Sequence, residues 1–133
     1  MFRGTVIGVP TVLTQLNGAE DRILNAAERG MARGMLGGQS VVRGNASGRP
    51  GPRAVTGAYR RSINGDSERA GTTIRGQIGT NAAQGRRLEY GFFGPDRLGR
   101  VYNQGPFPHF QPSVSEVTSI ASAEMSSAVN GAL

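Results

Sequence analysis

The chain contains no cysteine and no lysine, and His109 is its only histidine. Without cysteine, neither a disulfide framework nor a thiolate metal site can form. A single histidine excludes a multi-histidine metal site, and no serine–carboxylate arrangement lies near it in the sequence. His109 is therefore expected to pack in the fold or to lie at an interface.

Patterns that carry catalysis or nucleotide binding are also missing. There is no G-x-x-x-x-G-K phosphate loop, and no strand is followed by G-x-G-x-x-G and a helix. The nine carboxylates are scattered, and pairs such as Glu20-Asp21 are better explained by a solvated helix face than by acid/base chemistry. We expect no catalytic residue, no cofactor and no bound metal, so the chain is predicted not to be an enzyme.

Long apolar runs are absent as well. No stretch approaches the roughly 20 apolar residues that a membrane span requires. The first ten residues, MFRGTVIGVP, lack the apolar region and cleavage site of a signal peptide. The protein is expected to be made and used in the cytosol, or in an assembly built there, with no membrane partner.

What the sequence does contain is arginine. All fifteen basic residues are arginines, against nine acidic residues, and the formal net charge is +6. The planar guanidinium group suits carboxylates, phosphates and aromatic faces at interfaces. A GC-rich genome would explain the arginine bias equally well, so charge alone does not establish nucleic-acid binding.

The length predicts a single domain spanning residues 1–133. A chain of this size buries roughly two-thirds of its unfolded surface and holds one modest core. A first helix, either continuous or broken at Gly18 or Gly30, is expected from Pro10 to the Gly37-Gly38 pair, because apolar residues recur between them at three- and four-residue steps. The short apolar stretch at residues 5–9 is either a strand or an extended arm.

The signal for a sheet comes in the middle of the chain. Residues 72–80, TTIRGQIGT, alternate with the period of two that is typical of a half-buried strand. A strand at residues 59–67 is expected to pair with it through a connection near residues 68–71. Asn64-Gly65 is an alternative place for a tighter turn or a bulge.

Two further helices are expected. Residues 82–90 predict a short helix ended by Gly91, and Pro112 opens a C-terminal helix with one apolar stripe. The predicted fold class is therefore α+β, a small antiparallel sheet packed by an N-terminal and a C-terminal helix, with long Gly/Pro-rich loops.

Residues 37–57 hold six glycines, two prolines and three arginines, with no acidic residue. Such a segment cannot offset its ordering entropy by itself, so we expect a flexible basic loop. This loop either contacts DNA or a neighbouring subunit, or is simply solvated. The residues that would contact DNA or face a lumen are Arg43, Arg49 and Arg53.

Residues 91–111 combine turn residues with five of the eight aromatic side chains. We interpret this stretch as an aromatic and proline-rich docking loop, although its aromatic residues could equally cap the core of the monomer. Glu89, just before it, would pair with a nearby or neighbouring arginine. The predicted contacts with another subunit or partner are Glu89, Tyr90, Phe92, Phe93, Tyr102, Phe107, Phe110 and Pro112.

Three sequence blocks carry a family resemblance: TGAYRRSI at residues 56–63, IGTNAAQGRRLEYG at 78–91 and PFPHFQPSVSE at 106–116. In this order they resemble the head–tail joining, or tail-completion, proteins of long-tailed double-stranded DNA bacteriophages. Those proteins typically show a Thr-Gly-x-Leu-x-x-Ser-Ile block, a Gly-Thr block leading to Glu-aromatic-Gly, and a Pro-Phe-Leu-x-Pro-Ala block before the last helix. Here Tyr59 replaces the usual leucine, and Ser113 stands where alanine is common.

The resemblance implies a virion structural protein of the phage neck, assembled in the host cytoplasm. Its small α+β subunit would form a ring, expected to have six copies, between the capsid's portal-connector assembly and the tail tube. The implied partners are copies of itself and neighbouring connector or stopper and tail-tube proteins, with passing contact to genomic DNA. Whether it would be a terminator or a joining protein is open.

The main alternative is a free-standing basic module that binds nucleic acid without sequence specificity. The net charge and the RGNASGRPGPR stretch at residues 43–53 support it. Against it, the aromatic residues cluster apart from the basic loop in the sequence, whereas a stacking platform needs the two interleaved.

Overall fold

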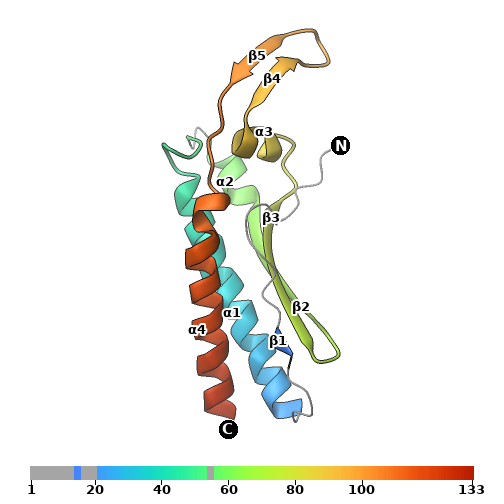
Figure 1. Ribbon diagram of the computed structural model, residues 1–133, viewed down its shortest axis with the longest axis vertical. Coiled ribbons are helices and arrows are strands. Elements are labelled where there is room, and N and C mark those ends of the chain that lie inside the picture. The colour runs from blue at the N-terminus through green and yellow to red at the C-terminus, as the bar shows by residue number, and fades with distance from the viewer. Residues whose placement is uncertain (1–13, 16–20, 54–55) are drawn as a thin grey trace.

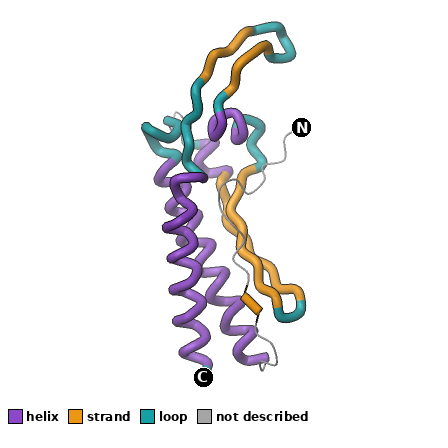
Figure 2. The backbone as a smooth tube through the Cα atoms, in the orientation of Figure 1, coloured by secondary structure: helices purple, strands orange, loops and turns teal. Residues whose placement is uncertain are grey.

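The structure is a computed structural model that describes residues 14–15, 21–53 and 56–133. Two long helices, α1 (Asp21–Asn45) and α4 (Val114–Ala132), run side by side in opposite directions along an elongated molecule (Figure 1). An antiparallel sheet packs on α1, and a second, two-stranded sheet projects beyond the end of the helices that lies away from the C-terminus (Figure 2). The predicted fold class, α+β, is confirmed.

The main sheet has the strand order β1-β3-β2. Strands β2 (Ile63–Ala70) and β3 (Thr73–Thr80) form the predicted hairpin, and β1 (Thr14–Gln15) pairs with the start of β3. The chain turns at Gly71, whose φ of 62° favours glycine. The predicted position of the first strand was partly wrong, because Ala58–Ser62 forms the short helix α2.

Asn64-Gly65 lies inside β2 and forms no turn. The glycine is needed there because a Cβ atom at position 65 would lie 2.5 Å from the carbonyl oxygen of Met35 on α1. The Gly65 N–H donates to Gln39 Oε1 at 2.8 Å, which ties the strand to the helix. Close approach to α1, and not reversal of the chain, explains this Asn-Gly pair.

The first helix differs from its predicted range at both ends. Thr14–Gln15 is a strand, so the helix does not extend back to Pro10, while Pro10 itself and residues 5–9 lie outside the described residues. The helix also passes through Gly37-Gly38 and ends at Asn45. The first part of the predicted flexible loop at residues 37–57 is therefore helical, and its Val42 is fully buried.

Tertiary packing explains why glycines do not stop this helix. Gly30, Gly34 and Gly38 recur every four residues and are all buried. A Cβ at Gly34 would lie 2.8 Å from the Cα of Ala121 on α4, and one at Gly38 would lie 2.6 Å from Ile78 and 2.8 Å from Val117. The low helix propensity of glycine is thus outweighed by the close packing that it permits.

A single core joins α1, β2, β3 and α4. Opposite α1, Gly76 of β3 leaves room for the sulfur atoms of Met31 and Met35, which would lie 2.6 and 2.7 Å from a Cβ there. The largest fully buried hydrophobic side chains are Phe110, Met31, Met35, Ile63, Ile74, Ile78, Val42 and Val117.

The segment that leads to the C-terminal helix is more ordered than predicted. The short helix α3 (Gly85–Tyr90) is confirmed, and Gly91 ends it with a φ of 85°. Within the predicted docking loop at residues 91–111, Phe92–Pro95 and Val101–Gln104 pair as strands β4 and β5. A 3-10 turn at Gln111–Ser113, which includes Pro112, then leads into α4.

Candidate functional site

A polar cluster, the polar junction, links the three sequence blocks; it consists of the buried Glu89, His109 and Ser113 and the half-buried Asn45 and Tyr59. Glu89 Oε1 accepts hydrogen bonds from the backbone N–H groups of His109 (3.1 Å) and Phe110 (2.7 Å). These donors lie just before α4, where backbone N–H groups lack partners within a helix. Glu89 of α3 therefore holds the start of the C-terminal helix in place.

His109 is held in one tautomer within the polar junction. Its Nδ1 lies 2.9 Å from the carbonyl oxygen of Phe107, which can only accept, so Nδ1 carries the proton. Its Nε2 then accepts from the Tyr59 hydroxyl at 2.6 Å. Burial lowers the pKa of His109, although the hydrogen bond to Phe107 and the charge of Glu89 oppose this shift. The imidazole is thus expected to be neutral.

The remaining members of the polar junction complete its hydrogen bonds. Ser113 Oγ donates to the carbonyl oxygen of His109 at 2.6 Å and accepts from Asn45 Nδ2 at 2.8 Å. Burial, with a smaller contribution from the charge of Glu89, raises the pKa of Tyr59 well above its usual range. Because these groups satisfy one another and Glu89 and His109 are buried, the junction fixes the fold where α1, α2, α3 and α4 meet.

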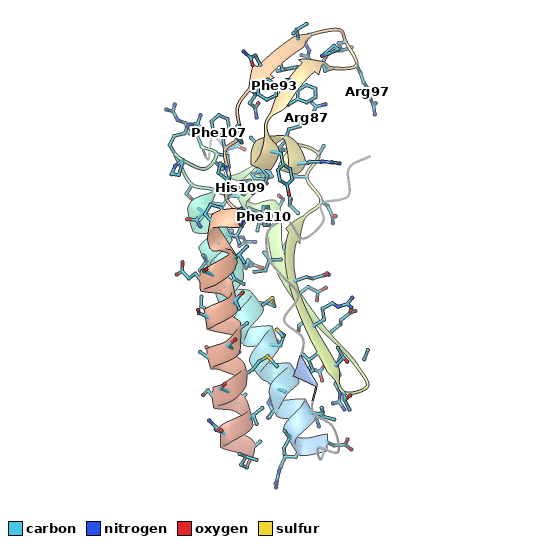
Figure 3. The ribbon with its side chains drawn as sticks, viewed as in Figure 1. Arg87, Phe93, Arg97, Phe107, His109 and Phe110 are labelled. Atoms are coloured by element: carbon cyan, nitrogen blue, oxygen red, sulfur yellow. The ribbon has the colours of Figure 1, made fainter. Side chains whose placement is uncertain are left out.

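The β4–β5 hairpin, which we call the arm, projects beyond the helices (Figure 3). Its tip is ordered by Asp96, which accepts hydrogen bonds from the N–H groups of Leu98 (2.9 Å) and Arg100 (3.0 Å) and from Arg100 Nε (2.7 Å). Desolvation tends to raise the pKa of Asp96, but these bonds and one from Tyr102 lower it overall. Gly99 closes the loop with a φ of 78°.

The arm presents apolar side chains to solvent. Phe93 is 64% exposed, Leu98 77% and Val101 79%. Two other aromatic side chains of the arm, Phe92 and Tyr102, pack against each other with ring centroids 5.7 Å apart. The Arg87 guanidinium lies 3.9 Å from the centre of the Phe92 ring. An ordered projection with exposed apolar side chains has the chemistry of a protein-binding element.

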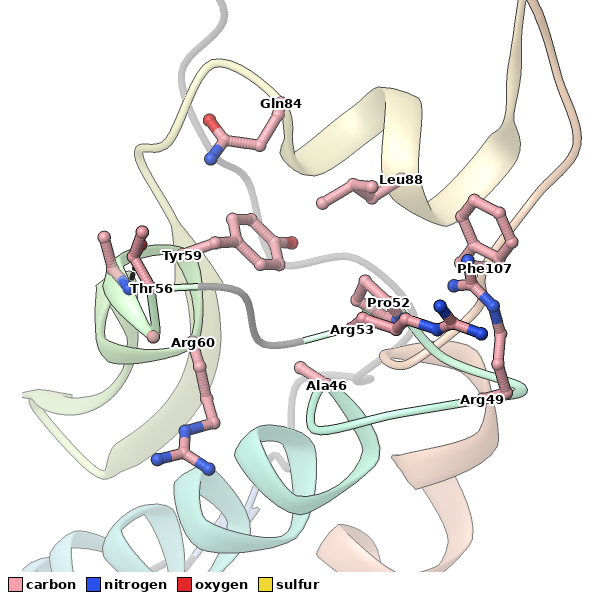
Figure 4. Close-up of a pocket in the computed structure, with 12 residues that line it drawn as sticks. Ala46, Arg49, Pro52, Arg53, Thr56, Tyr59, Arg60, Gln84, Leu88 and Phe107 are labelled. Carbon is pink, nitrogen blue, oxygen red and sulfur yellow. Dashed lines mark hydrogen bonds between the residues drawn. The ribbon is translucent and has the colours of Figure 1, made fainter.

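A concave feature, the arginine pocket, lies between the end of α1, α2 and α3 (Figure 4). It has a volume of about 290 Å³. Arg49 lies over the Phe107 ring, 3.8 Å from its centre. The pocket is lined by Ala46, Arg49, Pro52, Arg53, Thr56, Gly57, Ala58, Tyr59, Arg60, Gln84, Leu88 and Phe107.

The structure separates the predicted partner residues into different places. Glu89 and Phe110 are buried in the chain's own fold, which corrects their predicted placement at a partner surface. Phe92, Phe93 and Tyr102 belong to the arm, whereas Phe107 is half-buried beside the arginine pocket. Tyr90 and Pro112 are exposed.

The three arginines that were predicted to contact DNA also lie in different places. Arg43 is half-buried and donates to the carbonyl oxygens of Ile63 (2.9 Å) and Arg61 (3.1 Å), so it ties α1 to β2. This placement corrects its assignment to a flexible loop. Arg49 and Arg53 line the arginine pocket together with Arg60, which sequence analysis did not select.

Two features were missed from the sequence, the arm and the polar junction. The arm is marked by Phe92-Phe93 and Val101-Tyr102 on either side of GPDRLGR, in which an aspartate and a glycine are suited to a turn. The polar junction had no local signal, because most of the hydrogen bonds that link its members join residues 20 to 68 positions apart along the chain.

Comparison with known proteins found no matching family model, no similar curated protein and no similar solved structure. Among the described residues, no helix is long and apolar enough to cross a membrane. The same part of the chain contains no group of three or more histidine or acidic side chains arranged to hold a metal ion.

Proposed function

We propose that this protein is a virion structural protein of a phage neck, in which copies of it form a ring that joins the DNA-filled capsid to the tail tube. Six copies is the expected number. Its partners would be other copies of itself and the adjoining connector or stopper and tail-tube proteins. The resemblance of the three sequence blocks supports this proposal, and their side chains meet in one structural unit, the polar junction.

The arm gives the proposed ring its strongest structural support. A ring requires a heterologous contact, in which one surface of a subunit meets a different surface of the next. The arm offers such a surface, because Phe93, Leu98 and Val101 are exposed on a projection away from the core. The Asp96 hydrogen bonds order its tip beforehand, which reduces the entropy lost on docking.

The test is ring formation by the purified protein, with and without connectors or tails, followed by negative-stain imaging and particle mass. The double variant Phe93→Ser/Leu98→Ser is expected to remain folded, because both side chains are exposed. It is expected to lose ring formation and head–tail joining. Circular dichroism and thermal unfolding check that the fold is retained.

A matched control is Leu36→Ser on α1, because Leu36 is 60% exposed and lies on the body of the molecule. This variant is expected to form rings like the parent protein. A parent protein that remains monomeric in the presence of connectors and tails would contradict the proposed function. Rings that persist in the arm variant would contradict the role of the arm.

One observation favours the alternative, a basic module that binds nucleic acid. Phe107 and Tyr59 lie in the same pocket as Arg49, Arg53 and Arg60, although the sequence separates these aromatic residues from the basic stretch. Aromatic and arginine side chains together can stack bases and contact phosphates. A monomer that binds DNA with steep salt dependence and never forms rings would favour this alternative.

A further inference from the structure

The arginine pocket combines positive charge with an apolar lining. Among the described residues that line it, three are arginines and none is acidic. Ala46 and Pro52 are buried, and Leu88 and Phe107 are half-buried. The pocket therefore suits a ligand that carries both an anionic group and an apolar group.

The positive charge of the pocket is not neutralised within the described part of the chain. The ion pairs found there involve Arg33, Arg69, Arg75 and Arg100, and none includes a pocket arginine. Like charges around one concavity create a potential that favours an anion. The pocket arginines thus have no acidic partner among the described residues.

Two of the guanidinium groups are positioned before any ligand arrives. Arg49 is held over Phe107 and donates to the carbonyl oxygen of Gly51 at 3.1 Å. Arg60 donates to Ser47 Oγ at 3.0 Å, and its guanidinium group points away from those of Arg49 and Arg53 (Figure 4). A guanidinium group has five N–H donors, so Arg49 retains donors for a ligand. Its preorganisation lowers the entropy lost on binding.

The size of the pocket and its lining favour a carboxylate over duplex DNA. A volume of about 290 Å³ lies at the lower end of the range for small-ligand pockets. It is suited to one or two side chains, whereas a DNA duplex presents its phosphates on a convex surface that cannot enter it. A carboxylate matches the paired N–H donors of arginine, and the apolar lining can hold a neighbouring aliphatic side chain.

We propose that the arginine pocket binds an acidic side chain together with an adjacent apolar side chain from a segment of a partner protein. The carboxylate pairs with Arg53 and the free donors of Arg49, whose side chains lie on the same side of the pocket (Figure 4). The apolar side chain packs on Leu88 and Pro52. This proposal assigns a binding site that ring formation through the arm neither requires nor uses.

The experiment titrates the full chain with the blocked dipeptide N-acetyl-Glu-Leu-amide and follows arginine Nε–Hε and aromatic signals by NMR. Binding is expected at millimolar concentration, with shifts at the pocket arginines and the Phe107 ring. The matched dipeptide N-acetyl-Gln-Leu-amide is expected to bind at least about tenfold more weakly, because its neutral amide has no negative charge and only one acceptor oxygen for the guanidinium groups.

Arg53→Gln is the informative variant, because the exposed Arg53 side chain makes no hydrogen bond to another described residue. It is expected to weaken binding of the acidic dipeptide about tenfold without altering the fold. Arg97→Gln is the control, because it removes the same charge from the exposed tip of the arm. It is expected to leave binding unchanged.

Several results would overturn the proposal. These are equal binding of the two dipeptides, equal loss in the Arg53 and Arg97 variants, or no shift at the pocket. Displacement of the acidic dipeptide by a short oligothymidylate at lower concentration, with steep salt dependence, would instead assign the pocket to nucleic acid. Because the titration needs only the monomer, its failure is distinguishable from a failure of ring assembly.

Discussion

Replacing Gly34 by alanine is expected to destabilise the protein, although alanine is the better helix former. Gly34 lies on the face of α1 that packs against α4, and a Cβ there would lie 2.8 Å from the Cα and 3.2 Å from the Cβ of Ala121. The first contact is with backbone, which cannot rotate away as a flexible side chain can. The two helices must therefore move apart or shift along each other.

The magnitude follows from two opposing effects. Gly→Ala in a helix interior gains about 1 kcal/mol of helix propensity. Overpacking a dense core costs about 1–3 kcal/mol, and contact with backbone favours the upper part of that range. The net loss of unfolding free energy is expected to be about 1–2 kcal/mol. Gly44→Ala in the same helix is the control, because nothing lies within 4 Å of a Cβ at that position.

The assay is urea unfolding of the parent and the two variants, followed by circular dichroism. Gly44→Ala is expected to increase the free energy of unfolding by up to about 1 kcal/mol. Gly44 lies near the end of α1, where the gain in helix propensity is smaller than in the helix interior. The two substitutions should thus change stability in opposite directions with similar m-values. If Gly34→Ala were as stabilising as Gly44→Ala, the close packing of α1 on α4 would be refuted.

Three further outcomes are expected. Glu89→Ala should lower the free energy of unfolding by about 2–5 kcal/mol in urea titrations, because the buried N–H groups of His109 and Phe110 lose their acceptor; a loss below about 1 kcal/mol would contradict this role. Because the pKa of His109 is lowered in the folded state, this histidine takes up a proton below about pH 6.5 in the unfolded chain but stays neutral in the folded chain until a lower pH. Stability should fall on acidification through that range, by at most about 1.4 kcal/mol per pH unit from this group, and His109→Gln should remove that part of the pH dependence. Asp96→Ala should increase hydrogen exchange at the Leu98 and Arg100 amides, which lose their acceptor, while core amides remain unchanged.

The sequence predicted the elements whose signal is local and periodic. The alternation in residues 72–80 located β3, and the spacing of Val117, Ala121 and Met125 located the buried face of α4. The bounds of α1 could not be predicted in this way. Whether Gly37-Gly38 ends a helix depends on Ile78, Val117 and Ile120, which lie far along the chain.

Part of the candidate site could be predicted, and part could not. The aromatic cluster at residues 91–111 was recognised, but sequence could not separate Phe93, which is exposed on the arm, from Phe110, which is in the core. The two are distinguished by distant contacts, because Glu89 binds the backbone of Phe110 from another helix. The arginine pocket forms only when the chain brings Arg49 onto Phe107, 58 positions further along.

A force applied to the arm reaches the rest of the molecule through the polar junction. The base of the arm is joined to the body where the N–H of Phe107 donates to the carbonyl oxygen of Leu88 at 2.7 Å. The next residue, Glu89, binds the two amides that precede α4. A pulling force on the arm tip is therefore transmitted, in part through these hydrogen bonds, to the start of α4. Along its length α4 is packed against α1 through glycine and alanine contacts. A load on the arm therefore reaches both these hydrogen bonds and the packing of α1 on α4.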